Sequence, residues 1–598
     1  MIPIRIRAAI LLLSVALSTL PAAAAQLQLA LPADEDLSES LTAASLTVGA
    51  IRDADGAPVR RDVVAAAQAD YRRLVAVLFE AGYFGPVISI QIDGVEAAAL
   101  PVISRQDPIG TVTISVQSGP RFLFRETRIA PVAPGTELPE DFAPGRPAGT
   151  DVLRRTTSAG IDRWRALGHA KAELAGQDIV ADHAANRLDA ALALAPGPKL
   201  QYGPLFVEGA ERVREDRIAR IADLRQGRVF DPEQVDEAAR RLVRTGAFRS
   251  VSITEADEIG PANTLPMTVQ VVERLPRRFG AGAELSSEDG LSLSTFWLHR
   301  NLSGAADSFR VEGEIEGIGG DTGGEDFRLS FAYNRPATFN PETDLYASAF
   351  IESLDQPNFQ SDRVGFEVGA RRIVDEEFNY SYGIAYEQSK VEDAFGRRDF
   401  SILSLPLEAE YNRRNDDLNP TDGFYIEASA EPFYGFRTAG AGIRFLADLR
   451  GYQGFGSEDR TVVAARLQLG SVVGPDLADT PAADLFFSGG GGTVRGQEFQ
   501  SLGVTLPSGR LVGGKSFLGF SGELRQGVTE KIGVVGFVDM GLISPNSDWS
   551  DGDTHVGAGL GIRYDTGIGP IRVDLGLPVS GPGDPSGVAI YIGIGQAF

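Results

Sequence analysis

The sequence predicts two architectures in one chain: tandem small α+β units, followed by an antiparallel, all-β transmembrane barrel of about sixteen strands. Three strand-ending prolines, Pro120, Pro198 and Pro276, lie 78 residues apart, and equal spacing at a domain-sized period indicates a repeat. From about residue 277 helical periodicity stops. Segments of about ten residues then alternate apolar and polar side chains, which is typical of strands with one face in lipid and one in a wet lumen.

The first 25 residues predict a secretory signal peptide. Arg5 and Arg7 form a basic start, an apolar stretch follows, and 23–25 are small alanines suited to cleavage before Gln26. The apolar stretch is short for a membrane span of about 20 residues, which makes an uncleaved anchor the lesser alternative. Because no later run is long and apolar enough for a helical span, strands are expected to cross the membrane.

Composition argues against several classes of function. The 598 residues include 81 Asp and Glu against 56 Lys and Arg, and a net charge of −25 argues against nucleic acid as the main partner. The absence of cysteine excludes disulfides and thiolate metal sites, and the four histidines show no metal-ligand spacing. With no P-loop and no Gly-x-Ser-x-Gly elbow either, we expect no metal, no cofactor and no enzymatic activity.

The residues before the barrel are predicted to form three α+β units, at 26–118, 119–197 and 198–276. The third unit shows the pattern most clearly. Asp231 is a helix N-cap, Pro232 occupies the first helical position, and Gly246 closes the helix in the left-handed conformation. Two alternating segments then predict strands. Tandem units of this kind behind a signal peptide are typical of periplasmic scaffolds.

The barrel is predicted over 277–598. Sixteen alternating segments fit there, and an even number of strands is usual in bacterial barrels of one chain. The final segment alternates from Val588 to Phe598, and a C-terminal Phe on such a strand is the usual recognition signal of outer-membrane barrels. A soluble sandwich could alternate in the same way, but the number and length of the segments favour the barrel. The longest gap, about 471–514, separates the eleventh strand from the twelfth.

That gap carries a motif. Val494-Arg495-Gly496 resembles the lid-loop motif of the BamA/TamA superfamily of outer-membrane barrels, in which an aromatic residue follows. Here Gln497 stands at the fourth position, and Phe499 is the nearest aromatic substitute. Three further segments are similar to motifs of that superfamily: Gly522-Glu523-Leu524-Arg525, Gly536-Phe537-Val538-Asp539-Met540-Gly541 and Asn419-Pro420-Thr421-Asp422-Gly423-Phe424.

The resemblance covers nearly the whole mature chain and implies a function. It implies that the tandem units are POTRA (polypeptide-transport-associated) domains in the periplasm of a Gram-negative bacterium, with the barrel in its outer membrane. Three such units favour the TamA family, outer-membrane subunits of the translocation and assembly module. Such a protein helps insert or translocate β-barrel or autotransporter clients through a lateral seam in its barrel. The implied partners are a TamB-like inner-membrane-anchored protein, unfolded outer-membrane protein clients and the lipid bilayer.

The resemblance also implies that the lid loop folds into the lumen and that Arg495 pairs with Asp539. Electrostatics agrees, because a guanidinium in a partly enclosed lumen is costly without a carboxylate. Alternation places Asp539 and Gly541 on the lumen face of one strand and Glu523 on that of another, so that Glu523 is a second expected anchor. The alternative is that Arg495 is a solvated arginine on an outer loop.

The seam is expected between the first strand, 279–286, and the last strand, 587–598. Gly280 and Gly282 lie in the first, and Gly593, Gly595 and Phe598 lie in the last. Glycine weakens strands, so the closing pair is expected to open and to let a client strand add by β-augmentation. The alternative is that these glycines only relieve packing inside the barrel.

Three other functions remain open. A BamA-like core insertase shares the same architecture. A two-partner secretion transporter usually has a plug helix before two POTRA domains, and no clear one is evident between Gln26 and Ser45. A passive outer-membrane channel would need neither tandem periplasmic units nor the Val-Arg-Gly motif.

Overall fold

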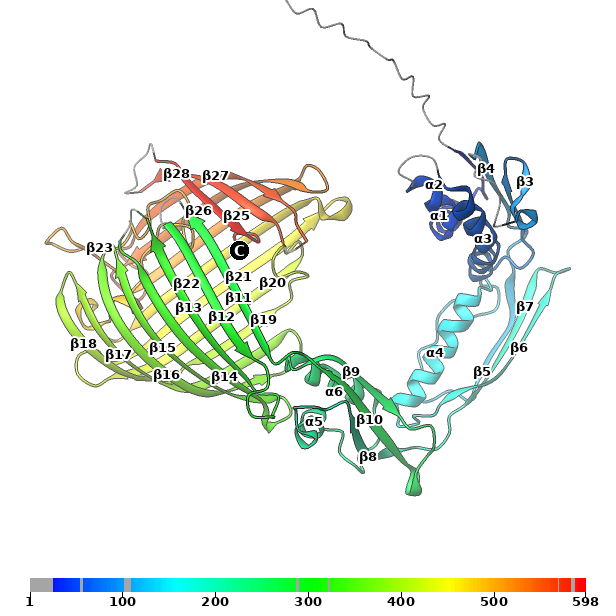
Figure 1. The fold of residues 1–598 in the computed structure, drawn as a ribbon, viewed down its shortest axis with the longest axis horizontal. Coiled ribbons are helices and arrows are strands. Elements are labelled where there is room, and N and C mark those ends of the chain that lie inside the picture. The colour runs from blue at the N-terminus through cyan, green and yellow to red at the C-terminus, as the bar shows by residue number, and fades with distance from the viewer. Residues whose placement is uncertain are drawn as a thin grey trace, which may run out of the picture. The chain divides into compact units, whose positions relative to one another are not determined.

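The computed structural model describes residues 25–53, 58–101, 109–286, 290–320, 323–567, 569–581 and 587–598 (Figure 1). The predicted signal peptide therefore lies outside the described residues except for Ala25. The chain packs as two compact units. One unit contains the described residues up to Gln201 with Val229–Glu233 and Pro261–Thr264, and the other contains the rest. In the described part of the chain, every helix is too short or too polar to span a bilayer.

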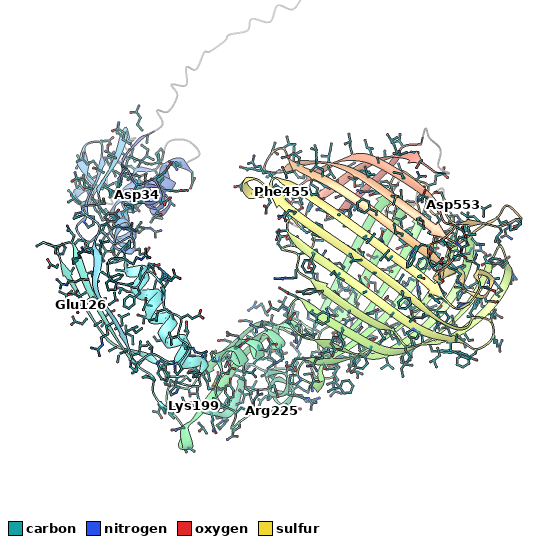
Figure 2. The ribbon with its side chains drawn as sticks, turned by 180° about the vertical axis from the view of Figure 1, so that it is seen from behind. Asp34, Glu126, Lys199, Arg225, Phe455 and Asp553 are labelled. Carbon is teal, nitrogen blue, oxygen red and sulfur yellow. The ribbon has the colours of Figure 1, made fainter. Side chains whose placement is uncertain are left out.

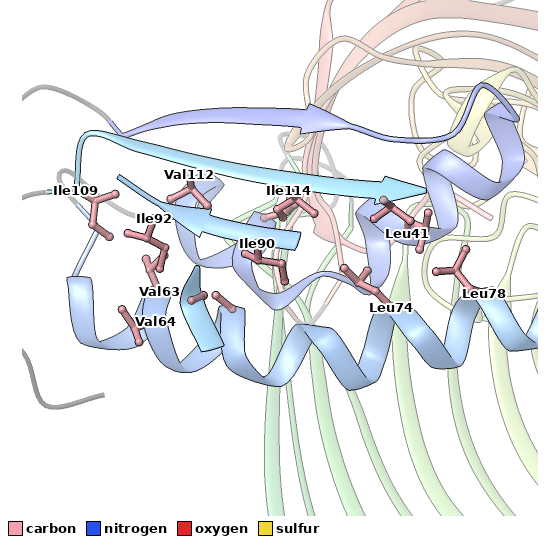
Figure 3. Close-up of a cluster of buried hydrophobic side chains, with 14 of the residues drawn as sticks. Leu41, Val63, Val64, Leu74, Leu78, Ile90, Ile92, Ile109, Val112 and Ile114 are labelled. Atoms are coloured by element: carbon pink, nitrogen blue, oxygen red, sulfur yellow. The ribbon is translucent and has the colours of Figure 1, made fainter. Parts of the chain in front are cut away.

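The first module has a four-stranded sheet in the order β1-β4-β2-β3. Its elements are β1 (Gln26–Ala30), α1 (Glu35–Ala44), α2 (Leu46–Arg52), α3 (Arg60–Glu80), β2 (Val87–Ile92), β3 (Val95–Glu96) and β4 (Thr111–Gln117). Helix α3 lies along one face of the sheet, and its Leu74 and Leu78 point to the side on which the sheet carries Ile90 and Ile114 (Figure 3). All four side chains are at most 1% exposed, so this packing forms the core of the module.

The second module has a three-stranded sheet in the order β5-β7-β6, with one helix against it. Its elements are β5 (Leu123–Ala130), α4 (Thr150–Ala166), β6 (Glu173–Asp182) and β7 (Arg187–Ala195). Gly160 lets α4 approach closely, since a Cβ there would lie 2.7 Å from the Leu194 side chain. Phe122, Phe124 and Leu188 are buried in this core.

The third module has the sheet order β8-β10-β9. Its elements are β8 (Gln201–Glu208), α5 (Glu215–Ala222), α6 (Pro232–Arg244), β9 (Phe248–Glu255) and β10 (Thr264–Glu273). Helix α6 begins at Pro232 as predicted, and the Asp231 side chain accepts the Glu233 N–H at 3.0 Å. Gly246 follows the helix with φ of +72°, the left-handed conformation expected of it.

Seventeen strands among the described residues then form a closed antiparallel barrel. They are β11 (Arg277–Ser286), β12 (Gly290–His299), β13 (Ser308–Ile318), β14 (Asp326–Asn340), β15 (Thr343–Gln356), β16 (Phe359–Ile373), β17 (Phe378–Asp393), β18 (Gly396–Ser404), β19 (Leu407–Asn412), β20 (Gly423–Gly435), β21 (Gly440–Phe455), β22 (Thr461–Val473), β25 (Ser516–Gly527), β26 (Ile532–Ser544), β27 (Asp553–Tyr564), β28 (Ile571–Ser580) and β29 (Ala589–Ile594). Strands β18 and β19 both pair with β17 and β20, so they are two halves of one strand, interrupted at Leu405 and Pro406. Proline has no N–H for the ladder, which explains the interruption. The wall thus has sixteen strand positions, and the predicted fold class is confirmed.

Side chains alternate across the barrel wall, and Figure 2 draws them as sticks along its strands. On β26, Val538 is 49% exposed on the outer face, whereas its neighbours Phe537 and Asp539 on the lumen face are 4% and 1% exposed. Phe455 at the end of β21 and Asp553 at the start of β27 mark opposite ends of the wall (Figure 2). The buried polar side chains therefore belong to the lumen, where the predicted lid loop would have to dock.

Candidate functional site

The predicted lid loop connects β22 to β25 and lies against the lumen face of β25–β28. Residues 474–515 form it, and they include the two short strands β23 (Val504–Thr505) and β24 (Leu511–Val512). Arg495 is only 3% exposed, which excludes the alternative of a solvated arginine on an outer loop. The loop is therefore an inserted element of the barrel rather than a surface connection.

Arg495 contacts carboxylates from three different strands. Its Nε lies 2.7 Å from Asp539 Oδ2 on β26, and its Nη1 lies 2.8 Å from Glu523 Oε1 on β25. The same Nη1 lies 3.2 Å from Asp574 Oδ2 on β28, and the guanidinium carbon stacks 3.6 Å from the centre of the Phe537 ring. The structure thus brings together Arg495, Asp539 and Glu523, which the sequence had singled out, and adds Asp574, which it had not.

Two wall arginines complete a buried charge network. Arg525 Nε lies 2.9 Å from Glu523 Oε2, and Arg563 pairs with Asp574. Three arginines thereby face three carboxylates. A buried ion costs several kcal/mol unless it is paired and hydrogen-bonded, so this balance is what allows the loop arginine to enter the lumen. The loop supplies one cation, and the wall supplies the other five charges.

Glycines make room for the motif on both sides of the contact. Gly496 has φ of +88°, and a Cβ there would lie 2.5 Å from the Leu577 backbone N. On the wall, a Cβ at Gly557 would lie 1.9 Å from the Arg495 carbonyl O, and one at Gly576 would lie 2.6 Å from Gly496 N. Loop and wall approach backbone to backbone, and any side chain at these positions would separate them.

Gln497 occupies the position where the superfamily motif has an aromatic residue, and it makes hydrogen bonds instead. Its Nε2 donates to Val556 O at 2.7 Å and to Ser580 O at 2.8 Å. The β27–β28 register shifts at Val556, so Gln497 supplies donors where the ladder is irregular. Phe499 does not take the aromatic's place, since it packs on Gly490 of the loop itself.

Ser488 and His555 form a further contact between loop and wall. Ser488 Oγ lies 2.8 Å from His555 Nε2, and both residues are at most 1% exposed. Gly541, predicted as a lumen partner, contacts this pair rather than Arg495, because a Cβ there would lie 2.3 Å from Ser488 Oγ. The four histidines were considered from the sequence only as metal ligands, and no sequence signal marks this role of His555.

The seam between the first and last strands is short. Among the described residues, β11 and β29 share two ladder pairs, Leu285 with Ile592 and Ser286 with Tyr591. On its other side, β11 pairs with β12 along all ten of its residues. Gly280 and Gly282 therefore lie on a stretch of β11 without a partner on β29. They also relieve packing, since a Cβ at Gly280 would lie 2.3 Å from the Phe296 ring.

The last strand ends earlier than predicted. Strand β29 stops at Ile594, and Gly595, with φ of +93°, turns the chain into the lumen. The prediction that alternation continues to Phe598 is wrong, and Phe598 is not on the seam. Phe598, 7% exposed, packs with Tyr452 and Ala464. Gly593 remains in β29, opposite Arg572 of β28.

The tail, residues Gly595–Phe598, begins at this turn. Hydrogen bonds hold it in the lumen. Gly595 N donates to Pro570 O at 2.8 Å, and Gln596 Nε2 donates to Asn419 Oδ1 at 2.9 Å. Arg563 Nε donates to Gln596 Oε1 at 2.7 Å, and Arg525 Nη2 donates to Phe598 O at 3.1 Å. Arg572 Nη1 also donates to Gln596 O at 3.3 Å, and Gln596 N donates to Leu418 O at 3.0 Å. The tail is thus bound by the two wall arginines of the charge network and by groups outside it.

Two family descriptions match the chain. An Omp85 superfamily domain matches residues 301–598, and a POTRA domain, described as a surface antigen variable number repeat, matches residues 201–274. Two relatives are named outer membrane protein assembly factor BamA. The one from Nitratidesulfovibrio vulgaris is 21% identical over 449 residues, 72% of this chain and 55% of its own. The one from Neorickettsia risticii is 21% identical over 426 residues, 67% of this chain and 55% of its own. The chain thus spans about half the length of these relatives.

Solved structures share the fold. BamA from Haemophilus ducreyi lacking POTRA domains 1–3 superposes with a TM-score of 0.63 at 17% identity, covering 79% of this chain and all of that one. CdiB from Acinetobacter baumannii superposes with a TM-score of 0.50 at 11% identity, covering 80% of this chain and 90% of that one. At these sequence identities the superpositions show a shared fold and nothing further.

Proposed function

Since the chain belongs to the Omp85 superfamily, with its barrel in the outer membrane and its POTRA domains in the periplasm, we propose that it is an outer-membrane protein assembly factor. It would insert or translocate β-barrel or autotransporter clients through the seam between β11 and β29. The observation that carries this proposal is the seam itself, with two ladder pairs where the opposite edge of β11 has ten.

The physical reason lies in the backbone of β11. The stretch Arg277–Glu284 has no partner on β29. Unsatisfied backbone groups cost several kcal/mol each in a bilayer, whereas a typical hydrogen bond in water nets only about 1 kcal/mol. An incoming client strand would satisfy these groups by β-augmentation. Client folding would supply the free energy, so we propose a non-enzymatic mechanism that needs no nucleotide, metal or cofactor.

The finer proposal is a TamA-like factor with a TamB-like partner anchored in the inner membrane. It is supported by the three small sheets that precede the barrel. Crosslinking in intact cells should then join the periplasmic modules to an inner-membrane-anchored, β-rich protein. Recovery of a single exported substrate would favour a two-partner secretion transporter instead, a candidate supported by the fold shared with CdiB.

A disulfide across the seam tests the main proposal. The sequence has no cysteine, so Leu285→Cys with Ile592→Cys introduces one reporter pair at directly opposed positions. Oxidation in native outer membranes should stop client insertion, and reduction should restore it. The matched control, Leu293→Cys with Ile315→Cys, joins β12 to β13 and should leave insertion unchanged. Undiminished insertion despite complete crosslinking at the seam would overturn the proposal.

A further inference from the structure

One network of buried charges contacts two separate segments, the lid loop and the tail. We infer that Arg525 and Arg563 couple docking of the lid loop to the inward position of the tail, so that release of one loosens the other. The inference rests on the proposed function, because the tail continues the last strand of the seam. It assigns a positioning role to two wall arginines and to Gln596.

The coupling begins at two shared carboxylates. Glu523 binds Arg495 of the loop through Oε1 at 2.8 Å and Arg525 of the wall through Oε2 at 2.9 Å. Asp574 binds Arg495 through Oδ2 at 3.2 Å. It binds Arg563 through both oxygens, through Oδ1 at the closer range and through Oδ2 at 3.3 Å. Glu523 therefore divides its two oxygens between a loop arginine and a wall arginine, whereas Asp574 shares Oδ2 between them.

The same wall arginines hold the tail with their remaining N–H groups. Arg525 binds Phe598 O through Nη2, and Arg563 binds Gln596 Oε1 through Nε. A guanidinium is a rigid planar fork, so its donors cannot be redirected one at a time. An arginine that rotates toward a newly vacated carboxylate oxygen must move its other donors away from the tail.

Release of the loop creates such vacancies. Without Arg495, three carboxylates face two arginines in a site almost closed to water, and uncompensated buried charge is strongly unfavourable. Arg525 and Arg563 are then drawn to the oxygens that Arg495 has left. The tail then loses the hydrogen bonds from Arg525 and Arg563 and keeps those with Pro570, Leu418, Asn419 and Arg572. Its inward position is therefore weakened.

The freed tail has a place on the seam. Continuing the observed antiparallel register of Leu285 with Ile592 puts Gly595 opposite Gly282 and Phe598 opposite Phe279. A docked loop therefore favours the inward tail and the unpaired β11 edge, whereas loop release shifts the tail toward a longer seam ladder. The network would thus set whether the edge is available to a client.

Two disulfide reporters in the full chain, in native outer membranes, test this coupling. Ala464→Cys with Ala597→Cys reports the inward tail, because both alanines pack in the Phe598 cluster. Ala283→Cys with Ile594→Cys reports the lengthened seam ladder. Introducing Arg495→Met should slow the first disulfide about fivefold or more, at the lower end of typical coupling strengths, and speed the second.

Arg328→Met is the matched control. Arg328 is another lumen arginine, paired with Glu352 at 2.6 Å, and among the described residues it has no ion pair or hydrogen bond with the lid loop or the tail. Its loss should leave both rates unchanged. If Arg495→Met exposes the lid loop to protease while both rates stay at their starting values, the inferred coupling is wrong.

Two further variants test the coupling if Arg495→Met fails to assemble into a heat-modifiable barrel. Glu523→Gln leaves the pair of Arg495 with Asp539 and removes the carboxylate toward which Arg525 would turn, so the tail disulfide should form at its starting rate or faster. A slower tail disulfide would contradict the proposed shift of Arg525. Coupling free energies are reciprocal, so Gln596→Ala should make the lid loop more sensitive to protease. A protected loop in that variant would overturn the inference. Both readouts report conformation, so they do not depend on whether the protein inserts clients.

Discussion

Gly557→Ala should undock the lid loop, and the structure supplies the magnitude. The new Cβ would lie 1.9 Å from the Arg495 carbonyl O and 3.3 Å from the Val494 side chain. Non-bonded carbons sit about 3.5–4.0 Å apart at their optimum, so the loop must retreat by roughly 1 Å or more. That displacement stretches the contacts of Arg495 with Asp539 and Glu523, now 2.7 and 2.8 Å. Overpacking costs about 1–3 kcal/mol, and each lost charge-assisted hydrogen bond costs about 1.5–3 kcal/mol.

The assay is protease sensitivity of residues 474–515 in intact outer membranes, read together with heat-modifiability of the barrel. The matched control is Gly451→Ala on β21, where the new Cβ would meet nothing within 4 Å. We expect rapid cleavage of the loop in Gly557→Ala and slow cleavage in the control, with both barrels closed. Equal protection of residues 474–515 in Gly557→Ala and in Gly451→Ala would refute the argument that the loop docks in the space left by the missing side chain of Gly557.

Two other perturbations have defined outcomes. Burial opposes ionisation of Glu273 and by itself would raise its pKa. Its carboxylate accepts hydrogen bonds at 2.8–3.0 Å from the backbone N–H groups of Val213, Arg212 and Glu211. These bonds outweigh burial and hold the pKa of Glu273 below the ordinary range. Its stabilisation is therefore present above the ordinary carboxyl pKa of about 4.3 and is lost as pH falls. Glu273→Gln should lower the free energy of unfolding of the third module by about 1–3 kcal/mol at neutral pH and by little in acid. Urea-dependent proteolysis of this module in the full chain measures the change. A decrease that is the same at both pH values would contradict the prediction. In the lid loop, Gln497→Glu replaces an amide that donates two hydrogen bonds by a carboxylate that donates none. It should weaken docking of the loop by about 2–3 kcal/mol, which would be measured as faster cleavage of the loop by protease. The control Glu498→Gln, at the neighbouring position, should leave the cleavage rate unchanged.

The fold was predictable because its periodicities are local. Apolar residues two apart define a strand with one lipid face wherever they occur, and the ladder of β26 with β27 follows directly from such alternation. The break at Leu405 and Pro406 was not anticipated, although a proline without an N–H is its local cause. Helix α6 could be placed to the residue because Asp231, Pro232 and Gly246 act within one or two turns.

The site was predictable only where a motif or a face assignment pointed to it. Arg495 came from the motif, and Asp539 and Glu523 came from strand alternation. Asp574 alternates in the same way, yet nothing marked it as an arginine partner until β28 lay beside the loop. The inward tail was missed because glycine is compatible with a straight strand. Contacts from residues distant in sequence turn it inward, and they include Pro570 O, Leu418 O, Asn419 and three wall arginines.

By itself, then, the sequence determined the element types, the order of modules and barrel, and the charged side chains that face the lumen. These depend on residue spacing and on the cost of burying charge, both of which are properties of short segments. The tertiary structure decided which charges meet, how few ladder pairs close the seam, and that the tail and the lid loop share Arg525 and Arg563. Those outcomes depend on barrel closure, which places residues dozens of positions apart within hydrogen-bond distance of one another, 2.7 Å for Arg495 with Asp539 and 3.1 Å for Arg525 with Phe598.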